Sequence, residues 1–104
     1  MRVYLTKGAT RQLRAILAYI ASENPPAAQM LVLRIEEIQS LLSENPGVGY
    51  KLPRSGLRRF PVRPYPYLIY YEVAGQSVRI VRIRHSARYR PAFHDPAQFF
   101  SRKA

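Results

Sequence analysis

The residues of this chain with the most chemically capable side chains are concentrated in its second half. Between Lys51 and Arg90 there are ten basic residues and one acid, Glu72. His85, Arg88 and Tyr89 close this region and bring together a group that titrates near neutral pH, a guanidinium and a phenol. Because a guanidinium fork suits phosphate and carboxylate groups, the pattern predicts an anionic partner, either nucleic acid or an acidic protein segment.

The net charge supports this interpretation through its distribution. The chain has seventeen Lys and Arg, fourteen of them Arg, and six Asp and Glu, so its formal net charge is +11. Ten basic residues and one acid between positions 51 and 90 account for +9 of that total, whereas the first fifty residues are almost balanced. Concentrated charge speeds the encounter with an oppositely charged partner, so it favours a binding surface over a basic surface that only aids solubility.

The composition narrows the class of protein. At 104 residues and 47% apolar content, the chain is expected to fold as a single domain over residues 1–104. It has no cysteine and only two histidines, His85 and His94, so we expect no disulfide, no metal and no cofactor. The longest apolar runs are far shorter than the roughly 20 residues that span a bilayer, and the N-terminus lacks the apolar core of a signal peptide. A reducing, cytoplasmic location fits these features.

A strand and a helix are predicted at the start of the chain. Val3 and Leu5 lie on one face and Arg2 and Tyr4 on the other, which is the alternation typical of a short strand over 2–5. The hydroxyl of Thr6 is placed to cap a helix that runs to about Ser22. The apolar residues of this helix recur at spacings of three and four and form one stripe: Ala9, Leu13, Ile16, Leu17 and Ile20.

The sequence Asn24-Pro25-Pro26 separates this helix from a second one. Helical geometry is disfavoured before a proline, Asn is a good N-cap, and Pro is tolerated in the first turn. The second helix is predicted over about 26–43, with this apolar stripe: Met30, Leu31, Ile35, Ile38, Leu41 and Leu42. Because so short a turn joins the two helices, we expect an antiparallel helical hairpin over about 7–43.

An antiparallel sheet is predicted for the second half. The run from Asn45 to Gly49 breaks the helix, and a loop extends to Gly56. Residues 57–62 are expected to form an edge or irregular strand because they contain Pro61. Residues 67–73 and 78–84 form a hairpin around the turn at 74–77. The predicted fold class is α+β, in the order β-α-α-β-β-β, with the basic sheet region at about 57–90 packed against the helical hairpin.

Strict alternation along the last hairpin strand predicts which residues share a face. It places Val78, Ile80, Arg82 and Arg84 on one face, and Arg79, Val81, Ile83 and His85 on the other. The first face changes from apolar to basic, so we expect Arg82 and Arg84 at a rim or groove where the sheet leaves its helical cover.

A last element is predicted beyond the hairpin. Asp95-Pro96 offers an N-cap and a first-turn proline, which predicts a short C-terminal helix or turn. We expect its Phe99 and Phe100 to pack back onto the sheet, because exposure of both rings would favour aggregation.

Several short motifs occur in an order that resembles a known family. They are Asn24-Pro25 with Ala27-Ala28, the Asn-Pro-Gly breaker after the second helix, Gly56-Leu57-Arg58, the run from Tyr67 to Tyr71, and the run from Val78 to Arg88. Together they resemble the RelE/ParE superfamily of bacterial type II toxin–antitoxin toxins over nearly the whole chain. The resemblance implies a small toxin with the fold predicted above, held inactive by a cognate antitoxin.

The resemblance implies one of two activities. RelE-like members are ribosome-dependent endoribonucleases that cut messenger RNA, whereas ParE-like members inhibit DNA gyrase and are not nucleases. RNA cleavage through the 2′-hydroxyl needs a base, a cation for the phosphorane charge and an acid for the leaving oxygen. On the nuclease hypothesis, His85 is the base or acid, Arg58, Arg82 and Arg88 hold the phosphate, and Tyr89 stacks a base or donates a proton.

The same residues have structural interpretations. A histidine at the end of a strand, such as His85, is commonly a hydrogen-bonded structural residue, and Tyr89 can simply anchor the tail. Lys51 and Arg54 lie in the loop where RelE-like nucleases carry catalytic lysines, but the full lysine cluster is absent. We therefore favour a ParE-like gyrase inhibitor that does no chemistry of its own, with the nuclease as the alternative. A third hypothesis is a family member that binds its antitoxin but has lost its toxicity.

The expected partners follow from the resemblance and the charge. The antitoxin is expected to contribute an acidic segment that folds on binding and lies along the helical hairpin and the basic rim of the sheet. The target is DNA gyrase, or the ribosome with messenger RNA on the alternative hypothesis. The rim residues expected to contact a partner are Arg63, Arg82, Arg84, Arg88 and Arg90.

Overall fold

The computed structural model describes residues 1–88, apart from the side chain of Arg88. The predictions for Tyr89, Arg90 and the C-terminal element with Phe99 and Phe100 lie outside these described residues.

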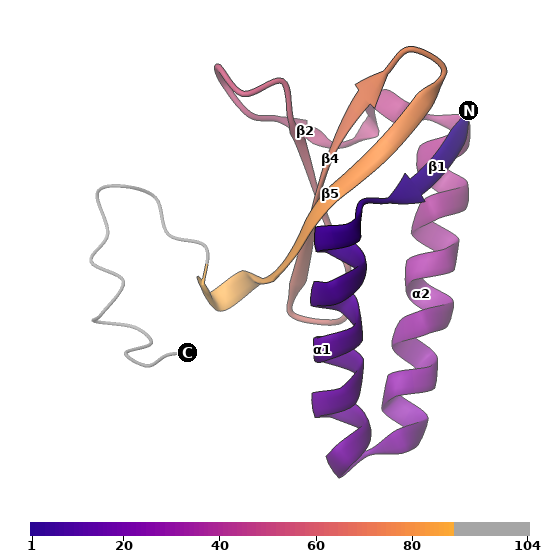
Figure 1. The fold of residues 1–104 in the computed structure, drawn as a ribbon, viewed down its shortest axis with the longest axis vertical. Helices are drawn as coiled ribbons and strands as arrows, with labels where there is room; N and C mark the ends of the chain where they lie inside the picture. Colours follow the sequence, from indigo (N-terminus) through magenta and orange to yellow (C-terminus); the bar gives the residue numbers. More distant parts are fainter. Residues whose placement is uncertain (89–104) are drawn as a thin grey trace.

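The described chain forms two helices and a sheet (Figure 1). Strand β1 (Arg2–Leu5) leads into helices α1 (Lys7–Glu23) and α2 (Pro25–Glu44), and a 3-10 turn follows at Pro46–Val48. The remaining strands are β2 (Tyr50–Lys51), β3 (Arg58–Pro61), β4 (Tyr67–Ala74) and β5 (Ser77–His85), and a second 3-10 turn covers Ser86–Arg88. The predicted α+β class and the helical hairpin are confirmed, and β2 is a short strand in the segment expected to be a loop.

The sheet has the strand order β1-β5-β4-β3-β2. The β3–β4 and β4–β5 pairs are antiparallel, as predicted. The pair of β3 with the unpredicted β2 is also antiparallel, but β1 pairs with β5 in parallel. The expectation of a purely antiparallel sheet is therefore wrong at this edge. The physical reason is that both helices and three strands separate β1 from β5 in the chain, so no tight turn dictates an antiparallel direction.

Pro61 lies where a strand has only one neighbour. Strand β2 begins at Tyr50, which pairs with Arg59, so β3 continues past the end of β2. Pro61 pairs with Leu68 of β4 on the other side. Because Pro has no N–H to donate, this half-edge position suits it, in agreement with the predicted edge or irregular strand.

The helix ends are capped as the sequence predicts. The hydroxyl of Thr6 accepts the backbone N–H of Ala9 at 3.2 Å. Asn24 serves both helices, because its backbone N–H donates to the carbonyl of Ile20 at 2.7 Å and its side chain accepts the N–H of Ala27 at 3.2 Å. One residue therefore makes the whole turn of the hairpin, and α2 begins at Pro25 instead of the predicted Pro26.

A single cluster of buried residues joins the helical hairpin to the sheet. Its members from the hairpin are Ala9, Leu31, Ile35, Ile38 and Leu42, and those from the sheet side are Val62, Tyr67, Ile69, Tyr71, Val78, Ile80 and Ile83. The predicted stripe of α2 is wrong at Met30 and Leu41, which are 55% and 38% exposed. Each precedes a buried residue by one position, and one residue is about 100° of helix rotation, which moves both side chains out of the buried seam.

Two side chains hold the segment 46–49 against the sheet. The fully buried Tyr71 donates its hydroxyl to the Pro46 carbonyl at 2.7 Å and accepts the Gly49 N–H at 2.8 Å. Arg58 donates through Nη1 to the carbonyls of Gly47 and Gly49, at 3.1 and 2.9 Å. A Cβ at Gly49 would lie 2.7 Å from the Tyr71 hydroxyl, so only glycine fits there. We call Tyr71, Arg58 and the segment 46–49 the latch.

The latch has a pH-dependent member. Burial raises the pKa of the Tyr71 hydroxyl above its ordinary value of 10.0, while the Gly49 hydrogen bond and the charge of Arg58 oppose the shift. Because the pKa is higher in the folded than in the unfolded chain, the contribution of this group to stability is fully present below pH 10. It is lost as the pH rises through the folded pKa, since the unfolded tyrosine ionises first.

We predict that Tyr71→Phe lowers the free energy of unfolding by about 1–3 kcal/mol at pH 7, because a buried N–H and a carbonyl lose their partner. Urea unfolding of both proteins between pH 7 and 11 would measure this. The gap between wild type and variant should narrow above pH 10, while the control Tyr19→Phe, at an exposed tyrosine, should behave like wild type. A gap that stays constant with pH would contradict the assignment.

Candidate functional site

The pairing of β4 with β5 contains one irregularity, at Val81. Tyr71 pairs with Ile80, but the preceding residue, Tyr70, pairs with Arg82, so Val81 is an extra residue in β5. One extra residue inverts the alternation of side chains beyond it. Ile80 and Ile83, on either side of the bulge, are therefore both buried, at 0% and 3% exposed.

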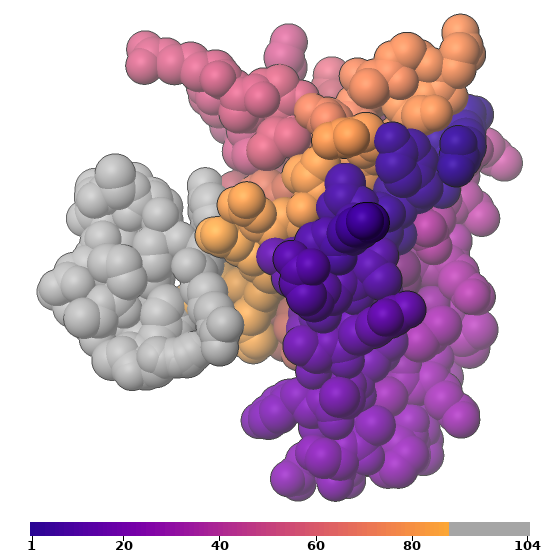
Figure 2. All heavy atoms as spheres, in the orientation of Figure 1, coloured from indigo at the N-terminus to yellow at the C-terminus, as the bar shows by residue number. Residues whose placement is uncertain are grey.

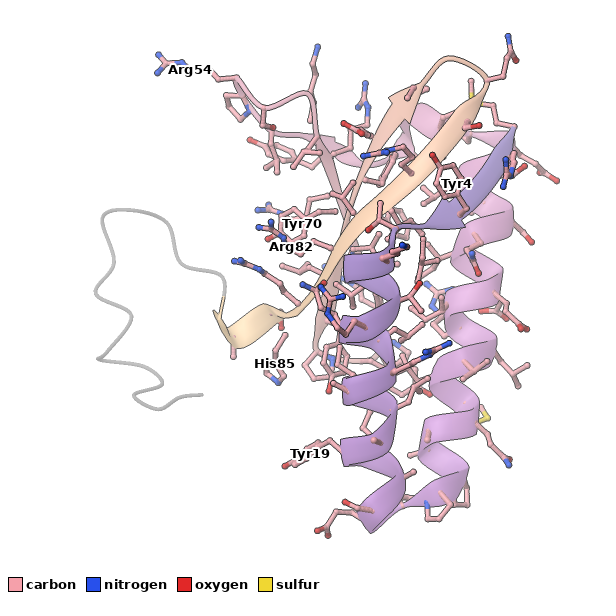
Figure 3. The ribbon with its side chains drawn as sticks, viewed as in Figure 1. Tyr4, Tyr19, Arg54, Tyr70, Arg82 and His85 are labelled. Atoms are coloured by element: carbon pink, nitrogen blue, oxygen red, sulfur yellow. The ribbon has the colours of Figure 1, made fainter. Side chains whose placement is uncertain are left out.

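This bulge corrects the face assignment made from strict alternation. Arg79, Arg82 and Arg84 pair with Glu72, Tyr70 and Leu68, which alternate on one face of β4. The three arginines therefore share the face of the sheet that points away from the helices. Figure 3 shows Tyr70 and Arg82 beside one another on that side. Arg82 is thus not on the face of Val78 and Ile80, as predicted, but on the opposite one.

We call this side of the sheet the outer face. Its members, from the strand register, are Arg2, Tyr4, Tyr50, Arg59, Pro61, Leu68, Tyr70, Glu72, Ala74, Ser77, Arg79, Arg82 and Arg84. Arg79 forms an ion pair with Glu72, with 2.8 Å between Nε and Oε2. A hydrogen bond with Tyr4 and the charge of Glu72 raise the pKa of Arg79. Because Glu72 offsets Arg79, the positive charge of the outer face comes from its other arginines.

Four of these residues form a row across four strands. Tyr50 pairs with Arg59, Arg59 with Tyr70, and Tyr70 with Arg82, so tyrosine and arginine alternate from β2 to β5. The guanidinium of Arg59 lies over the ring of Tyr50, 5.2 Å from its centroid. With strands about 4.8 Å apart, the row is roughly 14 Å long. We call these four residues the Tyr-Arg row.

His85 belongs to the opposite side of β5. Two positions along from the buried Ile83, it pairs with Tyr67, and their rings meet edge to face with centroids 5.3 Å apart. Its Nδ1 accepts the backbone N–H of Ala87 at 3.0 Å, which starts the turn at Ser86–Arg88. An accepting Nδ1 carries no proton, so this bond requires the neutral tautomer of the imidazole with its proton on Nε2.

The residues expected to act together in the nuclease hypothesis lie apart. Arg58 pairs with Tyr71 of β4, and His85 pairs with Tyr67 of the same strand. These two positions are four residues apart, so the backbones of Arg58 and His85 are separated by roughly 13 Å along the strand direction. Arg82 projects from the other face of the sheet. The Nη1 of Arg58 is held by two carbonyls of the latch. The side chain of Arg88, and Tyr89, lie outside the described residues.

Two of the predicted partner-binding arginines lie at the end of the sheet where β5 leaves it. Arg63 is exposed in the loop between β3 and β4, and its carbonyl accepts Nε of Arg34 at 2.6 Å. The Ser86 N–H donates to the Pro66 carbonyl at 2.7 Å, which holds this loop beside the end of β5, next to the exposed Arg84. Arg84 is thus part of the outer face, Arg63 lies in the adjoining loop and contacts α2 through its carbonyl, and Arg90 lies outside the described residues.

One positioning residue gives no signal in the sequence. Strand β1 ends at Leu5, opposite Ile80, so β5 continues without a neighbour on that side. The side chain of Gln12, from α1, accepts the Ile83 N–H at 2.9 Å and replaces the missing strand. In the sequence, Gln12 is only a polar residue beside an apolar stripe. Arg59 and Tyr50 were also missed as a pair, because β2 was not predicted.

Residues 1–88 offer neither a cluster of metal ligands nor a membrane-spanning helix. No three His, Cys, Asp or Glu side chains come together there in a way that could hold a metal ion. Neither α1 nor α2 has the length and apolar character that crossing a membrane requires.

Comparison with known proteins identifies relatives over most of the chain. Residues 3–89 match the family model described as the ParE toxin of the type II toxin–antitoxin system parDE. A protein named toxin RelE2, from Caulobacter vibrioides, is 44% identical over 87 residues, which are 84% of this chain and 97% of that protein. The putative toxin Y4kP of Sinorhizobium fredii is 31% identical over 90 residues, 86% of this chain and 93% of that one.

A solved structure agrees with these matches. A chain of the chromosomal ParDE toxin–antitoxin system from P. aeruginosa superposes with a TM-score of 0.71 and 26% identity, covering 82% of this chain and 95% of that one. The resemblance drawn from the sequence is confirmed at the level of the superfamily. The chain therefore belongs to the ParE toxin family of type II toxin–antitoxin systems, within the RelE/ParE superfamily.

Proposed function

We propose that this toxin inhibits DNA gyrase, acts by binding without chemistry of its own, and is neutralised by a cognate antitoxin. The observation that carries the proposal is the separation of Arg58, Arg82 and His85. General acid–base catalysis needs its groups within hydrogen-bond reach of one reacting centre. Here Arg58 is engaged by the latch, and His85 and Arg82 belong to opposite faces of β5.

The alternative is a ribosome-dependent nuclease, favoured by the 44% identity to a protein named toxin RelE2. That hypothesis requires His85 to exchange a proton at neutral pH. Its Nδ1 already accepts the Ala87 N–H, which suits a structural role at the end of β5. Gyrase and ribosomes are both cytoplasmic targets, so either hypothesis favours a cytoplasmic location.

Purified toxin should inhibit DNA supercoiling by gyrase in the absence of ribosomes, and cleaved DNA should accumulate. The assay uses the full chain with gyrase, ATP and relaxed plasmid, and scores supercoiled and linear products separately. Toxin saturated with its antitoxin is the control and should restore supercoiling. If folded toxin leaves gyrase fully active and instead cuts messenger RNA on ribosomes, the nuclease alternative replaces the proposal.

Substitution of His85 separates a structural from a catalytic role. Asn can keep an acceptor oxygen for the Ala87 N–H but cannot exchange a proton near pH 7, so His85→Asn should retain growth inhibition within about threefold. Loss of a general base or acid instead costs about 10²–10⁴-fold. His85→Ala, which removes the acceptor, is the paired variant, and thermal unfolding of both shows whether the fold survives. A folded His85→Asn protein without toxicity would contradict the binding mechanism.

The antitoxin partner is proposed to be acidic where it meets the sheet. Arg84 lies on the outer face and Arg63 in the loop beside the end of β5, whereas α2 carries exposed Glu36, Glu37 and Glu44. An acidic segment is repelled by Glu36 and Glu44, whereas the charge of Glu37 is offset by its ion pair with Arg34. This distribution supports a path over the rim of the sheet and the outer face in place of the solvent side of α2.

We expect association with the antitoxin to slow steeply as salt increases, because the attraction between exposed charges is screened. The double variant Arg63→Gln/Arg84→Gln should bind roughly tenfold more slowly at low salt and show a weaker salt dependence. The matched control is Lys7→Gln/Arg11→Gln, which removes two exposed charges from α1. Stopped-flow measurement of association rates tests this, and equal slowing of both double variants would contradict docking at the rim.

A further inference from the structure

The Tyr-Arg row presents alternating rings and guanidinium groups on a rigid support. Its four members are directly opposite one another on consecutive strands, so the hydrogen-bonded backbone sets their spacing. Tyr50, at one end, is 61% exposed, and Arg82, at the other, is also exposed. Arg59 and the buried Tyr70 lie between them. The row therefore offers a partner an exposed ring and an exposed cation, separated by roughly 14 Å.

The surroundings of the row add positive charge. The row contains no carboxylate, and the nearest acid on the outer face, Glu72, is paired with Arg79. The arm between β2 and β3 projects from the body beyond the row (Figure 2). Arg54, at the tip of this arm, lies on the same side as Tyr70 and Arg82 (Figure 3). The latch anchors the base of the arm through Gly49.

The exposed ring of Tyr50 distinguishes between two kinds of anionic partner, because the other ring of the row, Tyr70, is buried. An acidic peptide would satisfy the guanidinium groups but has no flat group to stack on Tyr50. A nucleic acid strand supplies both, because its phosphates bind arginine and its bases stack on tyrosine. Alternating cations and rings in a positive groove or face are typical of surfaces that bind single strands.

We propose that the Tyr-Arg row binds a strand of DNA, and that through it the toxin contacts the DNA held by gyrase. This inference rests on the proposed function and adds a second contact to it. Arg82 binds a phosphate, Tyr50 stacks a base, and Arg59 holds the Tyr50 ring in place. An antitoxin segment over the rim and outer face would then block the DNA contact directly.

The test measures DNA binding without gyrase. Fluorescence anisotropy of a labelled 20-nucleotide single strand is recorded with full-length toxin over a range of salt concentrations. Arg82→Gln should flatten the slope of log K against log salt by about 0.7, the value for one phosphate contact on a single strand. Tyr50→Ala should weaken binding about tenfold and leave the slope unchanged. Both side chains are exposed, so the fold should be preserved.

Arg14→Gln is the matched control, because it removes one exposed charge from α1, away from the row. Absence of DNA binding by wild-type toxin, or an equal loss in Arg14→Gln and Arg82→Gln, would overturn the inference. An RNA strand of the same sequence is the second arm, and RNA bound tenfold tighter than DNA would overturn the assignment to DNA. Toxin that binds DNA through the row but leaves gyrase active would refute the proposed function and the contact with DNA held by gyrase, whereas DNA binding by the row would stand.

Discussion

The extra residue at Val81 is the constraint on which the arrangement of this surface depends. Before it, Val78 and Ile80 face the helices, and after it Ile83 does so again. Without the bulge, Arg82 would point into the apolar core, where an unpaired guanidinium is very costly. The bulge lets one strand supply three buried residues to the core and three arginines to the outer face.

The core and the outer face are therefore coupled through single strands. Strand β4 places Tyr71, a member of the latch, in the buried core. Its neighbour Tyr70 lies in the Tyr-Arg row. Strand β3 likewise contributes one residue to each side, with Arg58 in the latch and Arg59 in the Tyr-Arg row. Consecutive residues of one strand thus serve the latch and the row on opposite faces of the sheet.

Charge is distributed unevenly over the molecule. The acids of the described residues are mostly on the helical hairpin, at Glu23, Glu36, Glu37 and Glu44, whereas the arginines are concentrated on the sheet. An anionic partner is therefore guided to one side. This arrangement supports the proposal that the antitoxin and the target use the same face.

The sequence by itself determined the two helices, their caps at Thr6 and Asn24, and the β4–β5 hairpin, because periodicity, capping and turn chemistry are local. It also placed the positive charge in the second half and indicated the superfamily. Tertiary structure alone decided the parallel edge at β1, the short strand β2 and the bulge at Val81. Each of these depends on which strands pair and in what register. The adjacent apolar residues Ile80 and Val81 do interrupt the alternation with arginine, but only the pairing with β4 shows that Val81 is the extra residue. The partners of Arg59 and Gln12 were decided in the same way, because their neighbours come from other strands and elements.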